Sequence, residues 1–313
     1  MNGRFERNTT PSKAKSRDGN DSRKGRDNRA RPESGTRQGS WRKQENPVTR
    51  RNYKITDSSE TREQSETQES FDKLEGRNSV IEALKSGRSI NKIFVARGEK
   101  EGSINQIIAL AKEKKVVIQE ADRSRLDMMS TTHAHQGVIA FVAAKDYVEV
   151  DDILEAAAAS GRAPFIIILD EITDAYNLGS ILRTANAAGA HGVIIPKRRA
   201  VGLTAAVSKA SAGALEYVPV ARVTNISQTI DYLKKQNIWV VGTDSTGAKP
   251  YYENNLKGPI ALVIGSEGEG IGKLVRESCD FIVNIPMAGQ ISSLNAAVAG
   301  AIVMYEILEQ RSK

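Results

Sequence analysis

The sequence predicts an α/β protein whose C-terminal domain is built on a mostly parallel sheet. Apolar runs such as 165–169 and 260–264 alternate with helical patterns, which is typical of parallel strands buried by helices on both faces. Polar or glycine-rich clusters follow several of these runs, and ligands of such sheets bind beyond the carboxyl ends of the strands. A smaller α/β domain and an Arg-rich N-terminal extension are predicted to precede this domain, and 313 residues are enough for all three parts.

The first 70 residues differ from the rest in composition. They contain no Leu and a single Ile, Ile55, and are rich in Arg, Ser, Asn, Gly and Thr. Because such a segment cannot bury enough apolar surface to offset its chain entropy, residues 1–70 are predicted to be a disordered extension. Residues 1–50 hold 14 Lys and Arg against 6 Asp and Glu, a net charge of +8, whereas the whole chain carries +7. The extension therefore either contacts RNA phosphates through charge or serves as a solubilising tail.

Cysteine usage and hydropathy limit the class of protein. Cys279 is the only cysteine, so no internal disulfide can form, which is consistent with a reducing cytoplasm. No apolar run approaches the roughly 18 residues of a membrane span. The N-terminus lacks the apolar segment of a secretory signal. We therefore expect a cytoplasmic protein.

Residues 71–145 are predicted to form the smaller α/β domain, followed by a linker at 146–160. The expected strands are 91–96, 116–119 and 138–143, and the expected helices are 79–85, 103–114 and 123–129. His133 and His135 precede the last strand, with no Cys or carboxylate close by at metal-ligand spacing. We predict a loop that packs or contacts substrate there, and no metal site.

Residues 161–313 are predicted to form the parallel-sheet domain. The expected strands are 165–169, 192–195, 217–220, 238–241, 260–264 and 281–285, and the expected helices are 178–188, 226–235 and a last helix from Leu294. Ser293 is the predicted N-cap of that last helix, because its hydroxyl can accept a hydrogen bond from a free helix N–H.

Three clusters lie at predicted strand ends, at 170–183, 263–270 and 285–295. None matches a phosphate-binding loop. The second lacks the glycine spacing of a dinucleotide fingerprint, and the stretch 242–249 (GTDSTGAK) has Ala248 where a P-loop has Lys. A dinucleotide-dependent oxidoreductase is therefore disfavoured. Since Glu267 and Glu269 would repel phosphate, the second cluster suits a ligand that is neutral or cationic nearby.

Taken together and in this order, the three clusters resemble the SpoU family of RNA 2′-O-ribose methyltransferases, within the knotted methyltransferase superfamily. One cluster alone would be weak: Arg183 could be a solvated surface residue, and 285–308 a plain capped helix. The matching residues are Asp174, Asn177, Gly179 and Arg183, then Gly265, Glu267 and Gly270, then Ile285, Pro286, Met287, Gly289, Ser293, Leu294 and Asn295. Ala175 departs from the family pattern, which usually has Pro there. The resemblance covers about residues 73–310.

The resemblance implies a fold and a cofactor. The C-terminal domain would form a deep trefoil knot, and the cofactor would be S-adenosylmethionine. Its adenosine pocket would be lined by Thr243, Gly265, Ile285, Met287 and Leu294. Gly76–Val80 and His135–Gly137 make the smaller domain similar to the L30e-like substrate-binding domain of the subgroup that modifies 23S rRNA, the RlmB type. Family members are homodimers, so a homodimer is implied, and no metal is expected.

The resemblance also implies the reaction, methyl transfer to a ribose 2′-hydroxyl, with a guanosine in the peptidyl-transferase P loop of 23S rRNA as the subgroup's target. Arg183 would either deprotonate the hydroxyl or bind the adjacent phosphate. Asn177, Ser293 and Asn295 would hydrogen-bond around the ribose, and Glu267 would act as base or anchor its own loop. Two alternatives stay open: a tRNA 2′-O-methyltransferase of the same family, and a non-catalytic rRNA-binding or assembly factor.

Overall fold

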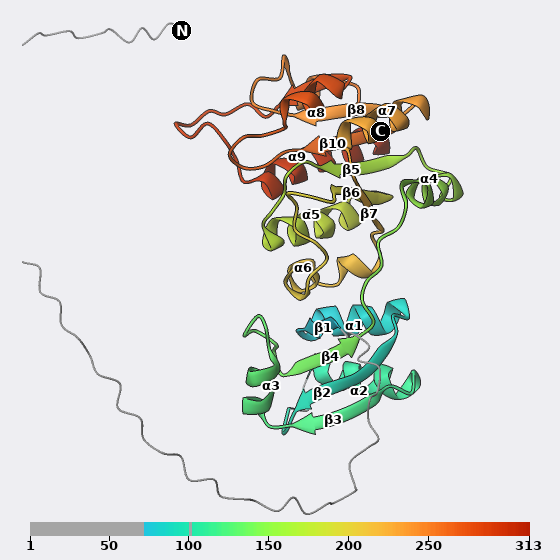
Figure 1. The fold of residues 1–313 in the computed structure, drawn as a ribbon, viewed down its shortest axis with the longest axis vertical. Coiled ribbons are helices and arrows are strands. Elements are labelled where there is room, and N and C mark those ends of the chain that lie inside the picture. Colours follow the sequence, from blue (N-terminus) through green and yellow to red (C-terminus); the bar gives the residue numbers. More distant parts are fainter. Residues whose placement is uncertain (1–71, 100–101) are drawn as a thin grey trace, which may run out of the picture. The chain divides into compact units, whose positions relative to one another are not determined.

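The computed structural model describes residues 72–99 and 102–313 (Figure 1). The predicted N-terminal extension, 1–70, lies outside the described residues. The described strands form two sheets, one of four strands within 72–142 and one of seven strands within 165–284.

The four-stranded sheet is mixed and has the order β1-β4-β2-β3. β4 is antiparallel to both β1 and β2, whereas β2 and β3 are parallel. Its strands are β1 (Asp72–Glu75), β2 (Ile90–Ala96), β3 (Val117–Ala121) and β4 (Val138–Val142), and its helices are α1 (Arg77–Ser86), α2 (Ser103–Glu113) and α3 (Arg123–Met129). The predicted elements of this region are confirmed to within one or two residues, and β1 is an addition.

Helices cover both faces of this small sheet. Val80 of α1 and Ile107 of α2 belong to the larger buried cluster, together with alternate strand residues such as Ile93. On the other face Leu126 of α3 packs with Phe94. Burial of alternate side chains on opposite faces explains why the central strand β4 is a continuous apolar run, VIAFV.

The seven-stranded sheet confirms the predicted parallel arrangement. Its order is β7-β6-β5-β10-β8-β11-β9, and every neighbouring pair is parallel. The strands are β5 (Phe165–Leu169), β6 (Gly192–Pro196), β7 (Val220–Val223), β8 (Trp239–Thr243), β9 (Lys249–Pro250), β10 (Ile260–Ile264) and β11 (Phe281–Asn284). Because all strands point the same way, the loops after β5, β6, β8, β10 and β11 meet at one edge of the sheet, which we call the carboxyl edge.

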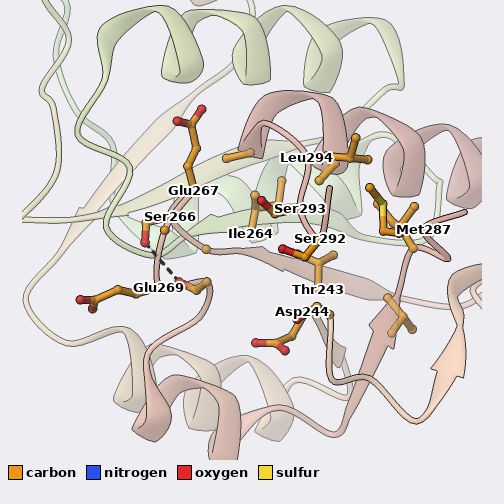
Figure 2. A pocket seen from close by; sticks show the side chains of 18 residues that line it. Thr243, Asp244, Ile264, Ser266, Glu267, Glu269, Met287, Ser292, Ser293 and Leu294 are labelled. Atoms are coloured by element: carbon orange, nitrogen blue, oxygen red, sulfur yellow. Dashed lines mark hydrogen bonds between the residues drawn. The ribbon is translucent and has the colours of Figure 1, made fainter. Parts of the chain in front are cut away.

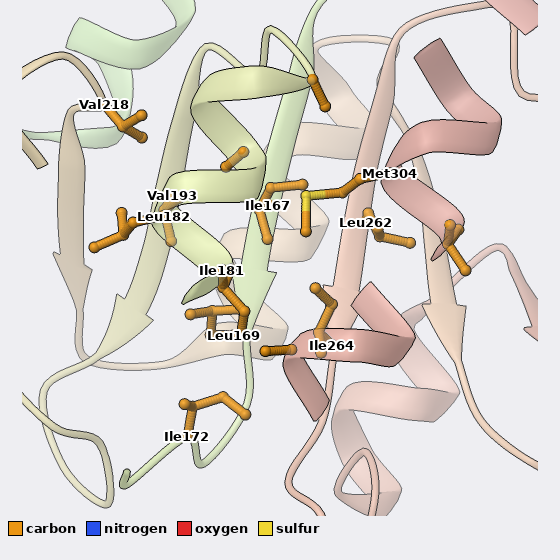
Figure 3. Packing of buried hydrophobic residues seen from close by; sticks show 14 of the residues in the cluster. Ile167, Leu169, Ile172, Ile181, Leu182, Val193, Val218, Leu262, Ile264 and Met304 are labelled. Carbon is orange, nitrogen blue, oxygen red and sulfur yellow. The ribbon is translucent and has the colours of Figure 1, made fainter. Parts of the chain in front are cut away.

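Helices on both faces bury this sheet. They are α4 (Val150–Ala159), α5 (Ala175–Ala187), α6 (Ala205–Ala210), α7 (Ile226–Lys235), α8 (Lys273–Ser278) and α9 (Ala296–Ser312), with 3₁₀ turns at Ala214–Glu216 and Tyr251–Glu253. On one face Ile167 and Leu262 pack with residues of α5 and with Met304 of α9 (Figure 3). On the other face Ile166 and Val263 pack with residues of α4, α7 and α8.

Several elements differ from the sequence-based prediction: α6, α8 and β9 are additions, and three further differences have a clear structural reason. Residues 150–159, predicted as part of a linker, form α4, whose Ile153 is buried directly over Gly192. The strand predicted at 217–220 lies three residues later, at Val220–Val223 (β7), because the chain before it forms the 3₁₀ helix Ala214–Glu216. α5 begins at Ala175 rather than at Leu178, since the Asp174 side chain accepts a hydrogen bond from the N–H of Asn177 and caps the helix there.

No helix among residues 72–99 and 102–313 is both long and apolar enough to cross a membrane.

Candidate active site

Three side chains from distant parts of the chain meet at the carboxyl edge. Asn177 lies in the first turn of α5, Glu267 in the loop after β10, and Asn295 immediately before α9. Asn177 Nδ2 donates to Glu267 Oε1 at 2.9 Å, and Asn295 Nδ2 donates to Asn177 Oδ1 at 2.9 Å. Asn295 Nδ2 also donates to Glu267 Oε1. We call these three residues the amide–carboxylate cluster; each comes from a different one of the three sequence clusters.

The Asn295 side chain holds the cluster and the last helix together. Its Oδ1 accepts hydrogen bonds from the N–H groups of Ala297 (3.0 Å) and Val298 (3.2 Å), so Asn295 is the N-cap of α9. The prediction that Ser293 caps this helix is therefore wrong. Residues 293–295 are still irregular chain, and the helix begins at Ala296. Because Oδ1 is committed to the helix, Nδ2 must face Asn177 and Glu267, which assigns the orientation of the amide.

The loop that carries Glu267 is a tight hairpin. The N–H of Ser266 donates to Gly270 O at 3.0 Å, and the N–H of Gly270 donates to Ser266 O at 3.1 Å. A Cβ on Gly265 would lie 2.1 Å from the Gly270 carbonyl carbon, and Gly270 itself has φ +68°. The hairpin can close only with glycine at these two positions, and its closure fixes the position from which the Glu267 side chain projects.

A cavity lies beside the cluster, and all five residues predicted to bind the cofactor line it. Thr243, Gly265, Ile285, Met287 and Leu294 come from β8 and from the loops after β10 and β11. Figure 2 shows that the side chains lining the cavity come from these separate segments. The complete lining is Thr243, Asp244, Ser245, Ile264, Gly265, Ser266, Glu267, Gly268, Glu269, Gly270, Val283, Ile285, Met287, Ser292, Ser293, Leu294, Ala296 and Ala299. This mixture of apolar side chains and exposed loop backbone suits a flat heterocycle.

Asp244 is a cavity residue that the sequence reasoning missed. Its Oδ1 accepts hydrogen bonds from the N–H (2.8 Å) and the hydroxyl (2.6 Å) of Thr246. Burial alone would raise the pKa of Asp244, but these hydrogen bonds and the charge of Arg276 lower it below its usual range. The cavity thus contains a carboxylate held in its charged form. Its position directly after Thr243, at the end of a parallel strand, was the available signal.

Two predicted catalytic residues stand apart from the cluster. Arg183 is exposed in the third turn of α5, and within the described part of the chain it forms no hydrogen bond or ion pair. Ser293 is exposed and lines the cavity, but makes no hydrogen bond with a described residue. The structure therefore brings Asn177, Glu267 and Asn295 into contact and leaves Arg183 and Ser293 available to a ligand.

Of the two histidines before the last strand of the smaller sheet, His135 is held by contacts with its neighbours. His135 is buried, with Nε2 2.9 Å from Asp127 Oδ1, and its Nδ1 accepts a hydrogen bond from the Gly137 N–H at 3.1 Å. His135 thus packs the loop, as one of the two predicted readings has it. Within residues 72–99 and 102–313 no group of three or more His, Cys, Asp or Glu is arranged to hold a metal ion.

A buried carboxylate, also missed from the sequence, fixes the same loop. Glu75 accepts hydrogen bonds from the Ser130 hydroxyl (2.8 Å) and the N–H groups of Thr131 (2.5 Å) and Thr132 (3.1 Å). Burial alone would raise its pKa, but these donors and the Thr132 hydroxyl lower it. Glu75 therefore holds the chain before β4 in one conformation.

A parallel sheet with an apolar, carboxylate-bearing cavity at its carboxyl edge defines an α/β protein that binds a small organic cofactor there. Family models sharpen this class. Residues 164–305 match the model of the SpoU rRNA Methylase family, and residues 73–148 match the model for RNA 2′-O ribose methyltransferase substrate binding.

Relatives that match three quarters of the chain agree. YacO of Bacillus subtilis, assigned to the TrmH family of tRNA/rRNA methyltransferases, is 52% identical over 237 residues, which is 76% of this chain and 95% of YacO. A TrmH family relative from Staphylococcus saprophyticus is 46% identical over 237 residues, with the same coverage. The chain belongs to the SpoU/TrmH family of RNA methyltransferases.

Similar solved structures identify the cofactor. The SpoU methyltransferase AviRb from Streptomyces viridochromogenes, in complex with S-adenosylmethionine, superposes with a TM-score of 0.64 at 28% identity, covering 77% of this chain and 90% of AviRb. An rRNA methyltransferase from Sinorhizobium meliloti with the same cofactor bound superposes with a TM-score of 0.60 at 26% identity, covering 76% of this chain and 86% of that one. The protein is an S-adenosylmethionine-dependent RNA methyltransferase.

The cavity fits this cofactor on its own chemistry. Ile264, Val283 and Leu294 provide apolar surface for an adenine, and the glycine-rich hairpin exposes backbone groups to it. Asp244 and Glu269 add carboxylates to the lining, which attract rather than repel a sulfonium cation.

Proposed function

We propose that the protein transfers a methyl group from S-adenosylmethionine to a ribose 2′-hydroxyl of 23S rRNA. The observation that carries the proposal is the amide–carboxylate cluster, which lies against the cofactor cavity through Glu267. A 2′-hydroxyl is both a donor and an acceptor, and a cluster of two amides and a carboxylate offers it both kinds of partner. The bound cofactor supplies an electrophilic methyl group; the residues must place and activate the hydroxyl.

Two members of the cluster, Asn177 and Glu267, have unused hydrogen-bonding capacity. Both Asn295 amide hydrogens and its oxygen are committed, whereas Asn177 Nδ2 donates only one of its two hydrogens to a described residue. Glu267 accepts both amide bonds through Oε1, and its Oε2 accepts none from the described residues. We assign ribose binding to Asn177 and Glu267, and a positioning role to Asn295.

Arg183 is assigned to an RNA phosphate. Its guanidinium is solvent-exposed and shares one helical face with Tyr176 and Ser180, which are also exposed. A planar guanidinium binds phosphate in a bidentate manner, whereas its permanent charge makes it a poor general base. Ser293, exposed in the cavity, is assigned to a hydrogen bond with the substrate ribose.

The substrate assignment is supported by the smaller sheet. Residues 73–148 match the model for RNA 2′-O ribose methyltransferase substrate binding. The family resemblance implies that the tRNA-modifying branch generally lacks this part. We propose a guanosine of the peptidyl-transferase P loop as the target, as in the RlmB-type subgroup. A tRNA is the second candidate, because relatives such as YacO are named for both substrates.

A homodimer is part of the proposal. Val298 and Tyr305, seven residues apart on α9, expose an apolar stripe, with 49% and 51% of their surfaces accessible. A second copy covering this stripe would bury it beside Asn295. Sedimentation should give a dimer for the wild type and a monomer for Tyr305→Asp; a monomeric wild type would refute the assignment. A trefoil knot is proposed on the family resemblance, and tracing the chain in a crystal structure tests it. A cytoplasmic location is proposed because a single cysteine allows no internal disulfide.

The deciding experiment is methyl transfer from labelled cofactor to unmodified 23S rRNA and tRNA transcripts, with Arg183→Ala alongside. We expect label in 23S rRNA, resistance of the labelled linkage to alkali as a 2′-O-methyl group, and at least a hundredfold lower kcat/KM for the variant. Cofactor affinity, measured by calorimetry, should be unchanged in the variant. Label in neither RNA, or undiminished transfer by Arg183→Ala, would refute the proposal. Label in tRNA alone would select the second candidate.

A further inference from the structure

Three consecutive cations follow β6 at the carboxyl edge. Lys197, Arg198 and Arg199 come directly after Pro196, the last residue of the strand, and all three are exposed. We call residues 197–199 the basic loop. Neither Lys197 nor Arg198 forms an ion pair with a carboxylate among residues 72–99 and 102–313, so both charges are available to an external anion.

Neighbouring segments hold the backbone of the basic loop on both sides. The N–H of Lys197 donates to Val223 O at 2.8 Å, and Arg222 Nη2 donates to Lys197 O at 3.1 Å. Beyond the loop, the N–H of Val201 donates to Ile172 O at 3.0 Å. The cations are therefore presented from a fixed backbone, which lowers the entropy lost when they bind a ligand.

Arg199 ties the basic loop to the segment that leads into the active site. Its Nη1 lies 2.7 Å from Glu171 Oε1, and Glu171 lies between β5 and Asn177. Both residues have left-handed backbone, with φ of +56° and +60°. An exposed ion pair of this kind adds little stability. It engages Arg199, whereas Lys197 and Arg198, beside the entry to α5, have no carboxylate partner in the described part of the chain.

Charge is unevenly distributed along the carboxyl edge. β6, with the basic loop, is next to β5, and on the other side of β5 come β10 and β8. The β10 and β8 ends carry the carboxylates of Glu267, Glu269 and Asp244. Asn177, following β5, lies between the two signs of charge. A cationic cofactor is favoured on the β10–β8 side, and a polyanion on the β6 side.

We propose that Lys197 and Arg198 form a phosphate-binding site for the RNA strand next to the target nucleotide, so that the strand crosses the carboxyl edge over β6 and β5 while the cofactor occupies the β10–β8 side. This proposal rests on the proposed function for the position of the target ribose. It adds the direction from which the substrate approaches and two residues that contact its backbone. Phosphate contacts position a nucleic acid without reading its sequence, so the site serves any RNA whose target reaches Asn177.

The test compares two double variants of the full chain that each remove two positive charges. Lys197→Ala/Arg198→Ala removes the basic loop cations. Lys235→Ala/Lys257→Ala removes two exposed cations at the opposite edge, at the end of α7 and before β10. Binding of an unmodified 23S rRNA transcript is measured by filter retention across a salt series, and S-adenosylmethionine binding by calorimetry.

For the basic-loop variant we expect the RNA Kd at 0.1 M salt to rise about tenfold and the slope of log K against log salt to shrink by about 1.4, as for two lost contacts to a single strand. The cofactor Kd should stay within twofold, and the control variant should bind RNA like the wild type. A change below twofold in the basic-loop variant, or equal changes in both variants, would overturn the proposal. Because RNA binding is measured without turnover, it decides this site even if the wild type transfers no methyl group, a result that would refute only the proposed function.

Discussion

The two edges of the seven-stranded sheet are built in different ways. At the carboxyl edge, Asn177, Glu267 and Asn295 bond to one another through their side chains. These contacts join residues 90 and 118 positions apart in the sequence. Left-handed backbone at Glu171 and Arg199 adds local strain there. Geometry at this edge therefore depends on a few side chains that only the complete fold brings together.

At the amino edge, side chains bond to the backbone instead. Arg311, near the end of α9, donates to the carbonyls of Ala163 (3.0 Å), Pro164 (2.8 Å) and Gly258 (2.6 Å). Its guanidinium also lies over the Phe165 ring, 5.1 Å from the centroid. Burial and the charge of Arg162 lower its pKa to about 10, so it keeps its charge near neutral pH. At this edge Arg311 therefore gives hydrogen-bond donors to backbone carbonyl groups that precede the strands and would otherwise lack partners.

The two ends of one helix, α9, therefore have different roles. α9 is capped by Asn295 at the carboxyl edge and carries Arg311 at the amino edge. Changes at the first end should affect activity far more than stability, and changes at the second end the reverse. Four predictions, in decreasing order of effect, test that division.

The largest effect is expected from Asn295→Asp. Its Oδ1 can still cap α9, but the two amide donors are lost and a second carboxylate faces Glu267. We expect kcat/KM for methyl transfer to fall by about 10²- to 10³-fold, because misplaced groups around a reacting hydroxyl carry a cost of that size. The free energy of unfolding, from denaturant titration, should change by less than about 1 kcal/mol.

Asn225→Ala is the matched control for this change. Asn225 caps α7 through a hydrogen bond from the Gln228 N–H at 3.1 Å and takes no part in the amide–carboxylate cluster. It should lose about 1 kcal/mol of stability and keep its activity. If Asn295→Asp kept full activity, or if both variants lost activity alike, the carboxyl edge would not depend on the cluster.

The second effect is on stability. Arg311→Met keeps much of the aliphatic volume but leaves three backbone carbonyls without their donor. We expect a loss of about 2–3 kcal/mol in the free energy of unfolding, and cofactor affinity within twofold of the wild type. Lys313→Ala, two residues further on, removes an exposed ion pair with Glu309 and should unfold like the wild type. Cofactor binding lost in parallel with stability would contradict the separation of the two edges.

Sequence alone located the strands well and the helix ends poorly. The strands 165–169 and 260–264 were predicted without error, because a strand buried on both faces must be a continuous apolar run. The cap of α9 was misplaced at Ser293, since either residue can cap a helix and the choice of Asn295 depends on partners in α5 and the β10 loop. α4 was hidden in a predicted linker, because its burial depends on the Gly192 surface.

The site was accessible only in part. Periodicity placed Asn177 and Glu267 at strand ends, but neither it nor the family resemblance predicted their contact across 90 residues, since Glu267 was expected to act as base or to anchor its own loop. Neither periodicity nor the family resemblance identified Asp244, because its hydrogen bonds from Thr246 exist only in the folded turn. The basic loop was visible as three adjacent cations, yet its significance depends on the strand order, which a sequence does not state.

The third effect concerns the carboxylate of the cavity. Asp244→Asn keeps an oxygen for Thr246 but removes the negative charge. We expect S-adenosylmethionine to bind about tenfold more weakly, and S-adenosylhomocysteine, whose sulfur is neutral, to bind nearly as before. Calorimetric titration of both ligands measures the difference. An equal loss for the two would mean that Asp244 shapes the loop rather than attracting the sulfonium.

The smallest effect is a pH dependence at the amino edge. His191 is buried; its Nδ1 accepts the Phe165 N–H at 3.0 Å, which requires a deprotonated nitrogen, and its Nε2 lies 2.9 Å from Ser160 Oγ. Burial, and then the charges of Arg162 and Arg311, lower the pKa of His191 below its usual value.

Because the folded state resists protonating His191, the unfolded chain binds more protons once the pH falls below the usual histidine pKa of about 6.5. The resulting stability is fully present above that pH and is lost as the pH falls through the lowered folded value, at no more than about 1.4 kcal/mol per pH unit. His191→Asn can accept the same N–H and does not titrate, so its free energy of unfolding should fall less steeply than that of the wild type between pH 7 and 5. Parallel curves for the two proteins would show that the amino edge owes none of its acid sensitivity to this histidine.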